Sequence, residues 1–299
     1  MKNVLFIIPY FGKFNNYFQL FLNSCGYNED YNWLIFTDDT RSFDYPKNVT
    51  VVYTSFNEVK ERIRKKLPDV KIKIESPYKL CDYKPLYGYL FEEYVEEYSF
   101  WGFCDLDLIF GNLNSFIKFE DIKKYDKIGV LGHFTLFNNT KENRELFFST
   151  DRYKQVFSSE KSYKFDEEFG EDLGISINNI FFENNKKIKD LQCFADIYVK
   201  SSKFKITHYN IAERKYSVEP KETSFYIWNC GELIKYLFQK ECWVEKKYMY
   251  IHLQKRKMKI KNTNNKIGIK DATIYLAFKR MEKDNLISSY FVFDLAFLS

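Results

Sequence analysis

The first 150 residues alternate between short apolar runs and amphipathic segments, and this alternation limits the folds that the chain can adopt. The apolar runs are rich in aromatic and β-branched residues, as buried strands of parallel sheets are, and they are Val4–Pro9, Trp33–Thr37, Val49–Tyr53, Phe100–Phe110 and Lys127–Leu131. Segments with helical spacing lie between them, over Phe14–Gly26, Phe56–Leu67 and Lys84–Tyr98. Strands that alternate with helices predict an α/β fold in which helices flank a mostly parallel central sheet.

After residue 150 this alternation weakens, and the organisation of the chain is inferred from composition. Short apolar runs such as Phe225–Trp228 mix with acidic loops, and the basic, polar segment Lys255–Lys270 predicts a loop. No linker rich in Pro, Ser or Gly divides the chain, so we expect one domain over residues 1–270. Residues 271–299 predict a C-terminal extension that is helical at first and then apolar.

Charge and cysteine usage exclude several classes of protein. The chain carries 46 basic and 41 acidic residues, whereas a dedicated nucleic-acid-binding protein usually has a larger basic excess and a recognisable module. Its six cysteines show no C-x-x-C spacing, which indicates reduced thiols in a cytoplasmic protein. The sequence contains no apolar stretch of about 20 residues that would span a membrane, and the N-terminal apolar run is too short for a signal peptide.

The motifs of several common enzyme classes are absent. The chain contains no G-x-G-x-x-G, G-x-x-x-x-G-K-[ST], G-x-S-x-G or H-E-x-x-H sequence, so dinucleotide-binding, P-loop, α/β-hydrolase and zincin functions have no support. Only three histidines are present, His133, His208 and His252, and this number excludes a metal site built mainly of histidines.

The most informative segment is Cys104–Leu108, in which two aspartates interrupt an apolar strand. Residues two apart in a strand point to the same side, so Asp105 and Asp107 would share a face while Leu106 packs behind them. Buried carboxylates are costly unless they are paired or bind a metal. A pair at the carboxyl end of a strand suits a divalent cation, Mn²⁺ or Mg²⁺, that also binds a diphosphate. The alternative is a sheet edge with two solvated aspartates.

The segment FWGFCDLDLIFGNL resembles the metal-binding D-x-D strand of GT-A-fold glycosyltransferases, which use nucleotide-diphosphate sugars. More narrowly, the chain resembles a little-characterised bacterial family of such enzymes encoded in capsule and lipopolysaccharide gene clusters. The other matching segments are IIPYFGKFNNYFQLFLNSC, YKLCDYKPLYG, GHFTLFNN and IHLQKRKM. The resemblance implies the GT-A fold, a catalytic domain over residues 1–270, and a nucleotide-sugar donor, with UDP-sugars favoured.

The resemblance places the nucleotide at the ends of the first two strands. Tyr10, Phe11 and Gly12 follow the first strand, where an aromatic ring can stack on the base and glycine permits close approach of the backbone. Asp38 and Asp39 end the second strand, where similar enzymes hydrogen-bond the base or ribose. The alternatives are a tight turn that needs Gly12, and a helix cap or Asx turn at the two aspartates.

The segment YKLCDYKP contributes Lys79, Asp82 and Lys84, which border the nucleotide-sugar pocket in similar enzymes. Pro85 suits the first turn of the following helix, which would place Lys84 at a helix N-terminus that faces an anion. Lysines that are simply solvated are the alternative. The resemblance also places Leu106 against the donor.

Two further segments carry candidate residues for the sugar or the acceptor. His133, in GHFTLFNN, can bind a sugar hydroxyl or a phosphate, and a histidine satisfied within the core is the alternative. Asp166 and Glu167 begin an acidic loop that continues through Glu168, Glu171 and Asp172. An acid there can contact sugar hydroxyls or act as a base, and a solvated acidic run is the alternative.

The segment YIHLQKRK resembles a late motif of retaining GT-A enzymes, in which a histidine completes the metal shell and a lysine binds the diphosphate. His252 would then join Asp105 and Asp107 as a ligand, and Lys255 would contact the phosphates. Arg256 and Lys257 are further candidates for phosphate contact. The chain departs from the usual H-x-x-G-x-x-K-P-W form, since it has neither the Gly nor the Lys-Pro-Trp.

Together these features predict a metal-dependent hexosyltransferase, of the retaining type, that acts on a glycan acceptor in bacterial surface-polysaccharide synthesis. The alternatives are a nucleotidyltransferase on a similar sheet, and a non-catalytic glycan-binding or assembly protein. Basic Lys255–Lys270 and apolar Tyr290–Leu298 suit contact with the inner face of the membrane near a lipid-linked acceptor, and equally suit a helix packed on the core. No nucleic-acid partner is expected.

Overall fold

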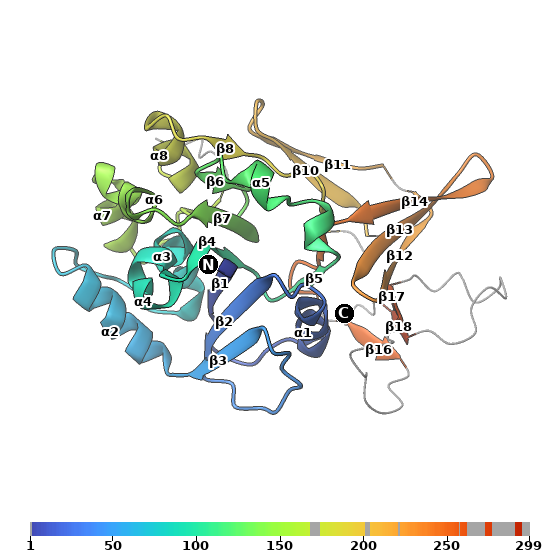
Figure 1. Ribbon diagram of the computed structural model, residues 1–299, viewed down its shortest axis with the longest axis horizontal. Coiled ribbons are helices and arrows are strands. Elements are labelled where there is room, and N and C mark those ends of the chain that lie inside the picture. The colour runs from blue at the N-terminus through green and yellow to red at the C-terminus, as the bar shows by residue number, and fades with distance from the viewer. Residues whose placement is uncertain are drawn as a thin grey trace.

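The computed structural model describes residues 2–167, 174–200, 204–220, 222–256, 258–261, 273–276 and 291–294 (Figure 1). It is a mixed α/β structure with three sheets, one of which is largely parallel. Besides the elements introduced below, the described chain contains η2 (Leu113–Ser115), α5 (Phe119–Ile122), α6 (Lys141–Glu145), η3 (Leu146–Ser149), α7 (Arg152–Phe157) and α8 (Ile177–Glu183).

The central sheet has seven strands in the order β3-β2-β1-β4-β7-β6-β8. Their bounds are β1 (Lys2–Pro9), β2 (Tyr31–Thr37), β3 (Val49–Tyr53), β4 (Tyr98–Cys104), β6 (Lys127–Ile128), β7 (Phe134–Asn138) and β8 (Ile188–Lys189). The first four strands are mutually parallel, while β7 runs antiparallel to both β4 and β6. The largely parallel sheet expected from the apolar runs is confirmed.

Helices cover both faces of this sheet (Figure 1). Successive residues of β1 point to opposite sides, so Phe6 packs in a cluster with α1 (Phe18–Gly26), whereas Ile7 packs in a cluster with α2 (Phe56–Lys66). The α2 helix begins with a capping box, in which the Ser55 hydroxyl accepts from the backbone N–H of Glu58 while the Glu58 carboxylate accepts from that of Ser55. The parallel strands thus lie between two layers of apolar core.

The helix expected over Lys84–Tyr98 is broken into three pieces. A 3₁₀ helix, η1 (Pro77–Leu86), comes first, and α3 (Tyr87–Leu90) and α4 (Glu92–Val95) follow. Pro85 lies inside η1, and Phe91, with φ of −122° and ψ of 38°, departs from helical geometry and separates α3 from α4. The expectation that Lys84 opens a long helix was therefore wrong.

The strand expected over Phe100–Phe110 divides at the two aspartates. After β4 the chain leaves the central sheet, turns through Asp105–Asp107, and enters a second sheet as β5 (Leu108–Phe110). The two aspartates therefore lie in a turn between sheets, and the premise that they alternate along one strand was wrong. The N–H of Asp105 still donates to the carbonyl of His133, which fixes where the turn begins.

The second sheet has the order β11-β10-β9-β15-β5. Its remaining strands are β9 (Ala195–Ile197), β10 (Ile206–Asn210), β11 (Lys215–Val218) and β15 (Tyr250–His252). In β15, His252 pairs with Leu108 of β5 on one side and with Asp196 of β9 on the other. This register brings His252 beside both the Asp105–Asp107 turn and Asp196.

The third sheet has the order β14-β13-β12-β17-β18-β16. Its strands are β12 (Ser224–Asn229), β13 (Glu232–Gln239), β14 (Cys242–Tyr248), β16 (Lys259–Lys261), β17 (Thr273–Leu276) and β18 (Phe291–Asp294). The strand expected at Phe225–Trp228 is confirmed as β12.

The C-terminal segment, expected to begin as a helix, is described at Thr273–Leu276 and Phe291–Asp294, and both of these pieces are strands. The other residues of 271–299, the basic stretch 262–270, Lys257, and the acids Glu168, Glu171 and Asp172 lie outside the described residues. Within the part of the chain that is described, no helix has the length and apolar character needed to cross a membrane.

Candidate metal centre and its pocket

A cavity of about 1100 Å³ opens at the carboxyl ends of β1 and β4. Its walls come from the segment after β1, the η1 helix, the Asp105–Asp107 turn and the second sheet, and also from the segment before β7 and the loop that carries Asp166. The carboxyl edge of a parallel sheet is where α/β proteins usually bind ligands, because the loops there diverge and leave a crevice. The cavity therefore lies where the sheet topology alone would place a site.

Asp105, Asp107 and His252 meet in this cavity, and each offers one ligand atom within 4.8 Å of the others. His252 Nε2 lies 3.3 Å from Asp107 Oδ1 and 3.9 Å from Asp105 Oδ2. Asp107 is buried, and among the described residues its Oδ1 makes no hydrogen bond beyond this ion-pair contact with His252. A buried carboxylate is costly unless a cation lies beside it, and that cation can be the His252 imidazolium or a metal ion. Two carboxylates and an imidazole are ligands that fit Mn²⁺ or Mg²⁺.

The other oxygen of Asp107 is held by the backbone. The N–H of Lys255 donates to Asp107 Oδ2 at 2.5 Å, and the N–H of Leu253 donates to the Asp107 carbonyl at 2.9 Å. Gln254 and Lys255 both have left-handed backbone conformations, with φ of 55° and 57°, which turn the chain back over the aspartate. This loop orients the carboxylate, so that Oδ1 faces His252.

The charged groups of this cluster shift one another's pKa values. Burial alone would lower the pKa of His252, but Asp107 and Asp196 outweigh it and raise that pKa to about 10. Burial likewise favours the neutral form of Asp107, but the His252 imidazolium and the Lys255 N–H lower its pKa to about 2. The acid therefore stays ionised, and the carboxylates attract either a proton or a metal ion to this position.

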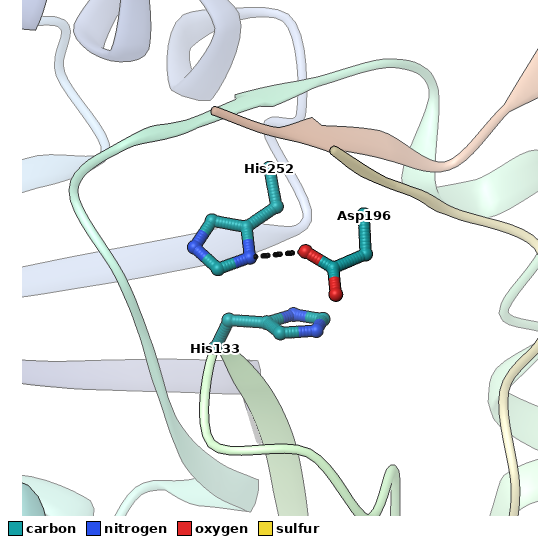
Figure 2. A group of neighbouring side chains, drawn as sticks. All are labelled: His133, Asp196 and His252. Carbon is teal, nitrogen blue, oxygen red and sulfur yellow. Dashed lines mark hydrogen bonds and ion pairs between the residues drawn. The ribbon is translucent and has the colours of Figure 1, made fainter. Parts of the chain in front are cut away.

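Asp196 supports His252 from behind, as Figure 2 shows. Its Oδ1 lies 2.9 Å from His252 Nδ1, and its Oδ2 accepts from the Thr207 hydroxyl at 2.8 Å. These partners hold the pKa of Asp196 well below its usual range, although burial opposes them. A carboxylate on one ring nitrogen leaves the other free to bind a metal, which is the usual arrangement of histidine ligands. No motif surrounds Asp196, so its role could not be predicted from the sequence.

His133 lies beside this pair (Figure 2) and lines the same cavity. It is 5% exposed, and its Nδ1 is 3.1 Å from the Tyr250 hydroxyl, whereas its Nε2 has no partner among the described residues. Burial and the neighbouring charge of His252 lower its pKa to about 4. His133 is therefore a neutral imidazole with one nitrogen unused.

Lys84 joins the metal cluster to the acidic loop. Its Nζ lies 2.8 Å from Asp105 Oδ1 and 3.1 Å from Asp166 Oδ2, and it donates to the Gly132 carbonyl at 2.8 Å. Burial disfavours its charge, but Asp105 and Asp166 raise its pKa well above the ordinary value. Burial raises the pKa of Asp166 to about 7, against the opposing effect of Lys84. Glu167 lines the cavity next to Asp166.

The residues expected at the nucleotide end divide into two groups. Tyr10 and Phe11 line the cavity, together with Leu106. Gly12, Asp38 and Asp39 are not among its lining residues and shape the loop after β1, as follows. The Gly12 N–H donates to Asp38 Oδ1 at 2.7 Å, the Phe14 N–H donates to Asp39 Oδ2 at 2.9 Å, and Asp39 pairs with Arg41. Gly12 has a φ of 100°, a conformation that favours glycine.

Lys79 and Asp82 are also absent from the cavity lining. They form a buried ion pair with 2.8 Å between Lys79 Nζ and Asp82 Oδ2. Asp82 also accepts from the backbone N–H groups of Tyr163 and Phe165, and thereby fixes the chain just before Asp166. The structure places these two residues behind the pocket wall, where they position the acidic loop.

The chain belongs to a protein family of unknown function, DUF6625. The model of this family matches residues 6–284, a span that contains every residue of the cavity described above. No curated protein matches the chain.

In this DUF6625 chain, the cavity carries both signs of charge. Its basic side chains are Lys13, Lys84, Lys164, Lys255 and Arg256, and its acidic ones are Asp105, Asp107, Asp166, Glu167 and Asp196. Lys84 is already paired with acids, whereas the Lys255 ammonium lies over the Tyr78 ring, 4.9 Å from its centre. The carboxylates of such a cavity can bind a metal ion, and the surrounding lysines and arginine can attract an anionic ligand beside it.

Proposed function

We propose that this protein is a metal-dependent glycosyltransferase of the GT-A fold, which transfers a hexose from a nucleotide-diphosphate sugar to a glycan acceptor. The observation that carries the proposal is the convergence of Asp105, Asp107 and His252 at the carboxyl edge of four parallel strands. The cavity of about 1100 Å³ beside them suits a ligand as large as a nucleotide sugar. Bacterial surface-polysaccharide synthesis is the proposed setting.

The residues of the cavity divide between the two ends of such a donor. Tyr10 and Phe11 supply aromatic surface for the base, while Asp105, Asp107 and His252 would hold Mn²⁺ or Mg²⁺. A cation held by these residues would supply positive charge to neutralise the diphosphate leaving group. Lys255 and Arg256 line the same cavity and add positive charge for the phosphates.

Asp166 and Glu167 are the proposed sugar-orienting acids. Asp166 is buried against Lys84, and its pKa is raised to about 7. Near neutral pH its carboxyl group can therefore donate a hydrogen bond to a sugar hydroxyl or accept one from it. Lys84 ties this acid to Asp105, so the sugar end and the metal end of the site share one ammonium group. The similarity of the His252–Lys255 segment to retaining enzymes favours retention of configuration.

The decisive experiment is a hydrolysis screen of UDP-, GDP- and dTDP-linked hexoses with Mn²⁺ and with Mg²⁺, followed by calorimetry with the matching diphosphate. We expect one nucleotide class to be hydrolysed slowly and only with metal. Metal-dependent binding without turnover, on every acceptor glycan offered, would favour a non-catalytic glycan-binding or assembly protein. Formation of pyrophosphate from a nucleoside triphosphate and a sugar phosphate would favour a nucleotidyltransferase. Absence of any nucleotide binding would overturn both enzyme functions.

A further inference from the structure

The imidazole of His133 is the one polar ring in the view of Figure 2 that makes no bond to the others drawn. Its ligand atom lies within 4.8 Å of those of Asp196 and His252, yet Nε2 has no partner among the described residues. The carboxylate of Asp196 is already satisfied by His252, Thr207 and Gln254. A buried nitrogen with no partner, on the wall of a cavity, indicates a contact that a ligand completes.

The hydrogen atom of the Tyr250 hydroxyl decides which nitrogen of His133 carries the proton. Tyr250 is fully buried, and among the described residues the only hydrogen-bond partner of its hydroxyl is His133 Nδ1 at 3.1 Å. If Nδ1 carried the proton and donated it, the hydroxyl hydrogen would be buried without an acceptor. That arrangement is costly, so the hydroxyl donates to Nδ1 and the imidazole proton resides on Nε2.

Aromatic packing holds both rings in this orientation. The Phe194 ring stacks on Tyr250 with 5.1 Å between centres and 1° between planes, and it meets the edge of His133 at 5.1 Å. The Phe134 ring stacks on Tyr250 at 5.2 Å. The His133 carbonyl also accepts from the N–H of Asp105, so the backbone of the ring-bearing residue is fixed to the metal turn. The Nε2–H group is therefore preorganised before any ligand arrives.

We propose that His133 donates a hydrogen bond from Nε2–H to a hydroxyl oxygen of the transferred sugar, and that Tyr250 is the positioning residue that sets this tautomer. The inference rests on the proposed glycosyltransferase function. A hydroxyl fits better than a phosphate oxygen, because the carboxylates of Asp196 and Asp166 lie on this side of the cavity and the Lys84 ammonium there is already paired with Asp105 and Asp166. Asp166 adjoins Gly132, the residue before His133: a Cβ on that glycine would lie 2.5 Å from Asp166 Oδ2.

The tautomer can be measured without any ligand, by NMR of protein labelled with ¹⁵N in histidine. The chain has three histidines, so substitution of each assigns the spectrum. We expect His133 to carry its proton on Nε2, and Tyr250→Phe to convert it to a mixture of tautomers. Tyr31→Phe is the matched control, because that hydroxyl is buried without a partner and lies outside the cavity lining. A proton on Nδ1 in the wild type would overturn the assignment.

The sugar contact is tested by calorimetry with Mg²⁺ and matched pairs: UDP against UDP-glucose and UDP-galactose, GDP against GDP-mannose, and dTDP against dTDP-glucose. For the pair that binds, His133→Phe and Tyr250→Phe should each lower the affinity for the nucleotide sugar about tenfold and leave the affinity for the diphosphate unchanged. His133→Gln, which retains a donor, should recover part of the loss. Equal weakening of sugar and diphosphate, or no weakening, would overturn the contact. Failure of every pair to bind would overturn the glycosyltransferase function itself, while the tautomer measurement would still decide the Tyr250–His133 geometry.

Discussion

The carboxylate of Asp196 and the imidazole of His252 are hydrogen-bonded at 2.9 Å, although 56 residues separate them in the chain. The parallel pairing of β9 with β15 sets these two residues side by side. The antiparallel pairing of β15 with β5 places His252 opposite Leu108, immediately after Asp107. The short strand β15 thus places His252 between Asp196, which supports it, and the two aspartates that would bind the metal with it.

Asp196→Asn should weaken Mn²⁺ binding by about 10- to 100-fold, because an amide neither fixes the His252 ring as firmly nor increases its basicity. Thr207→Val, which removes a donor to the far oxygen of Asp196, should have a smaller effect in the same direction. Titration calorimetry with Mn²⁺ measures both variants. An Asp196→Asn protein with the wild-type Mn²⁺ affinity would show that His252 is no ligand or needs no support.

Asp107→Asn should abolish Mn²⁺-dependent UDP binding and leave the far-UV circular dichroism unchanged. The substitution removes the charge on an oxygen that no described hydrogen bond satisfies. Metal binding should therefore weaken strongly, while the fold is little affected. Asp38→Asn is the matched control, since this exposed aspartate lies outside the cavity lining. If the Asp105→Ala, Asp107→Ala double variant retains the wild-type response to Mn²⁺, the metal assignment fails.

Gly132→Ala should lower turnover about 100-fold without unfolding the protein. An added Cβ would lie 2.5 Å from Asp166 Oδ2 and must displace that carboxylate from Lys84. A small displacement of a catalytic group has effects of this size. Combined with Asp166→Asn, the substitution should have no additive effect, because both changes remove one interaction. Steady-state kinetics of the two single variants and the double variant test this expectation. Additive losses in turnover would contradict it and place Gly132 and Asp166 in separate roles.

Asp166→Asn and Glu167→Gln should alter the choice of donor sugar as well as the rate. Loss of a hydrogen bond to one sugar hydroxyl leaves a pocket group unpaired, so the pocket discriminates less between epimers. Loss of a general base would instead cost about 10²–10⁴-fold in rate with selectivity retained. Competition assays with paired epimeric donors separate these outcomes. An NMR time course that shows an inverted anomeric centre would contradict retention and assign the base to one of these acids.

Lys127 should make the stability of the protein depend on pH. It is buried in β6, with its ammonium on the Gly129 carbonyl, and burial lowers its pKa to about 7. Between pH 7 and about 10.4 the unfolded chain keeps a proton that the folded chain has released. The free energy of unfolding therefore rises with pH, by up to ~1.4 kcal/mol per unit from this group.

Lys127→Met isolates this contribution. Below pH 7 the wild type should be less stable than the variant by a constant amount, and the difference should shrink towards pH 10. Urea unfolding at a series of pH values measures this difference in stability. Lys123→Met, at an exposed lysine, is the control for loss of one charge. A difference between wild type and Lys127→Met that does not change with pH would contradict the burial argument.

Much of the central sheet could be predicted from local pattern. Apolar runs such as Trp33–Thr37 and Val49–Tyr53 correspond to β2 and β3, since continuous burial on both faces leaves a signal within one segment. The path of the chain near Pro85 and Asp105 could not be predicted in the same way. In both places the tertiary structure overrides a run that looks continuous: one helix is broken and one strand is divided between two sheets.

The candidate site shows the same division. Asp105 and Asp107 could be named from the sequence because carboxylates inside an apolar run are conspicuous, and His252 because its segment resembles a late motif of retaining GT-A enzymes. Asp38, Asp39, Lys79 and Asp82 were equally conspicuous, yet they bond to backbone or to one another outside the cavity lining. Residue type indicates what a side chain can bind, and its direction depends on packing.

The sequence by itself determined the parallel strands, the charged residues available for a metal, and the edge of the sheet at which they gather. Only the tertiary structure decided that Asp196 supports His252, that Tyr250 faces His133, and that Lys84 joins Asp105 to Asp166. The physical reason is that strand and helix periods are properties of neighbouring residues, whereas these contacts arise from the register of strands and loops distant in the chain. A shift of β15 by one residue would turn His252 to the opposite face of its sheet and separate it from both aspartates.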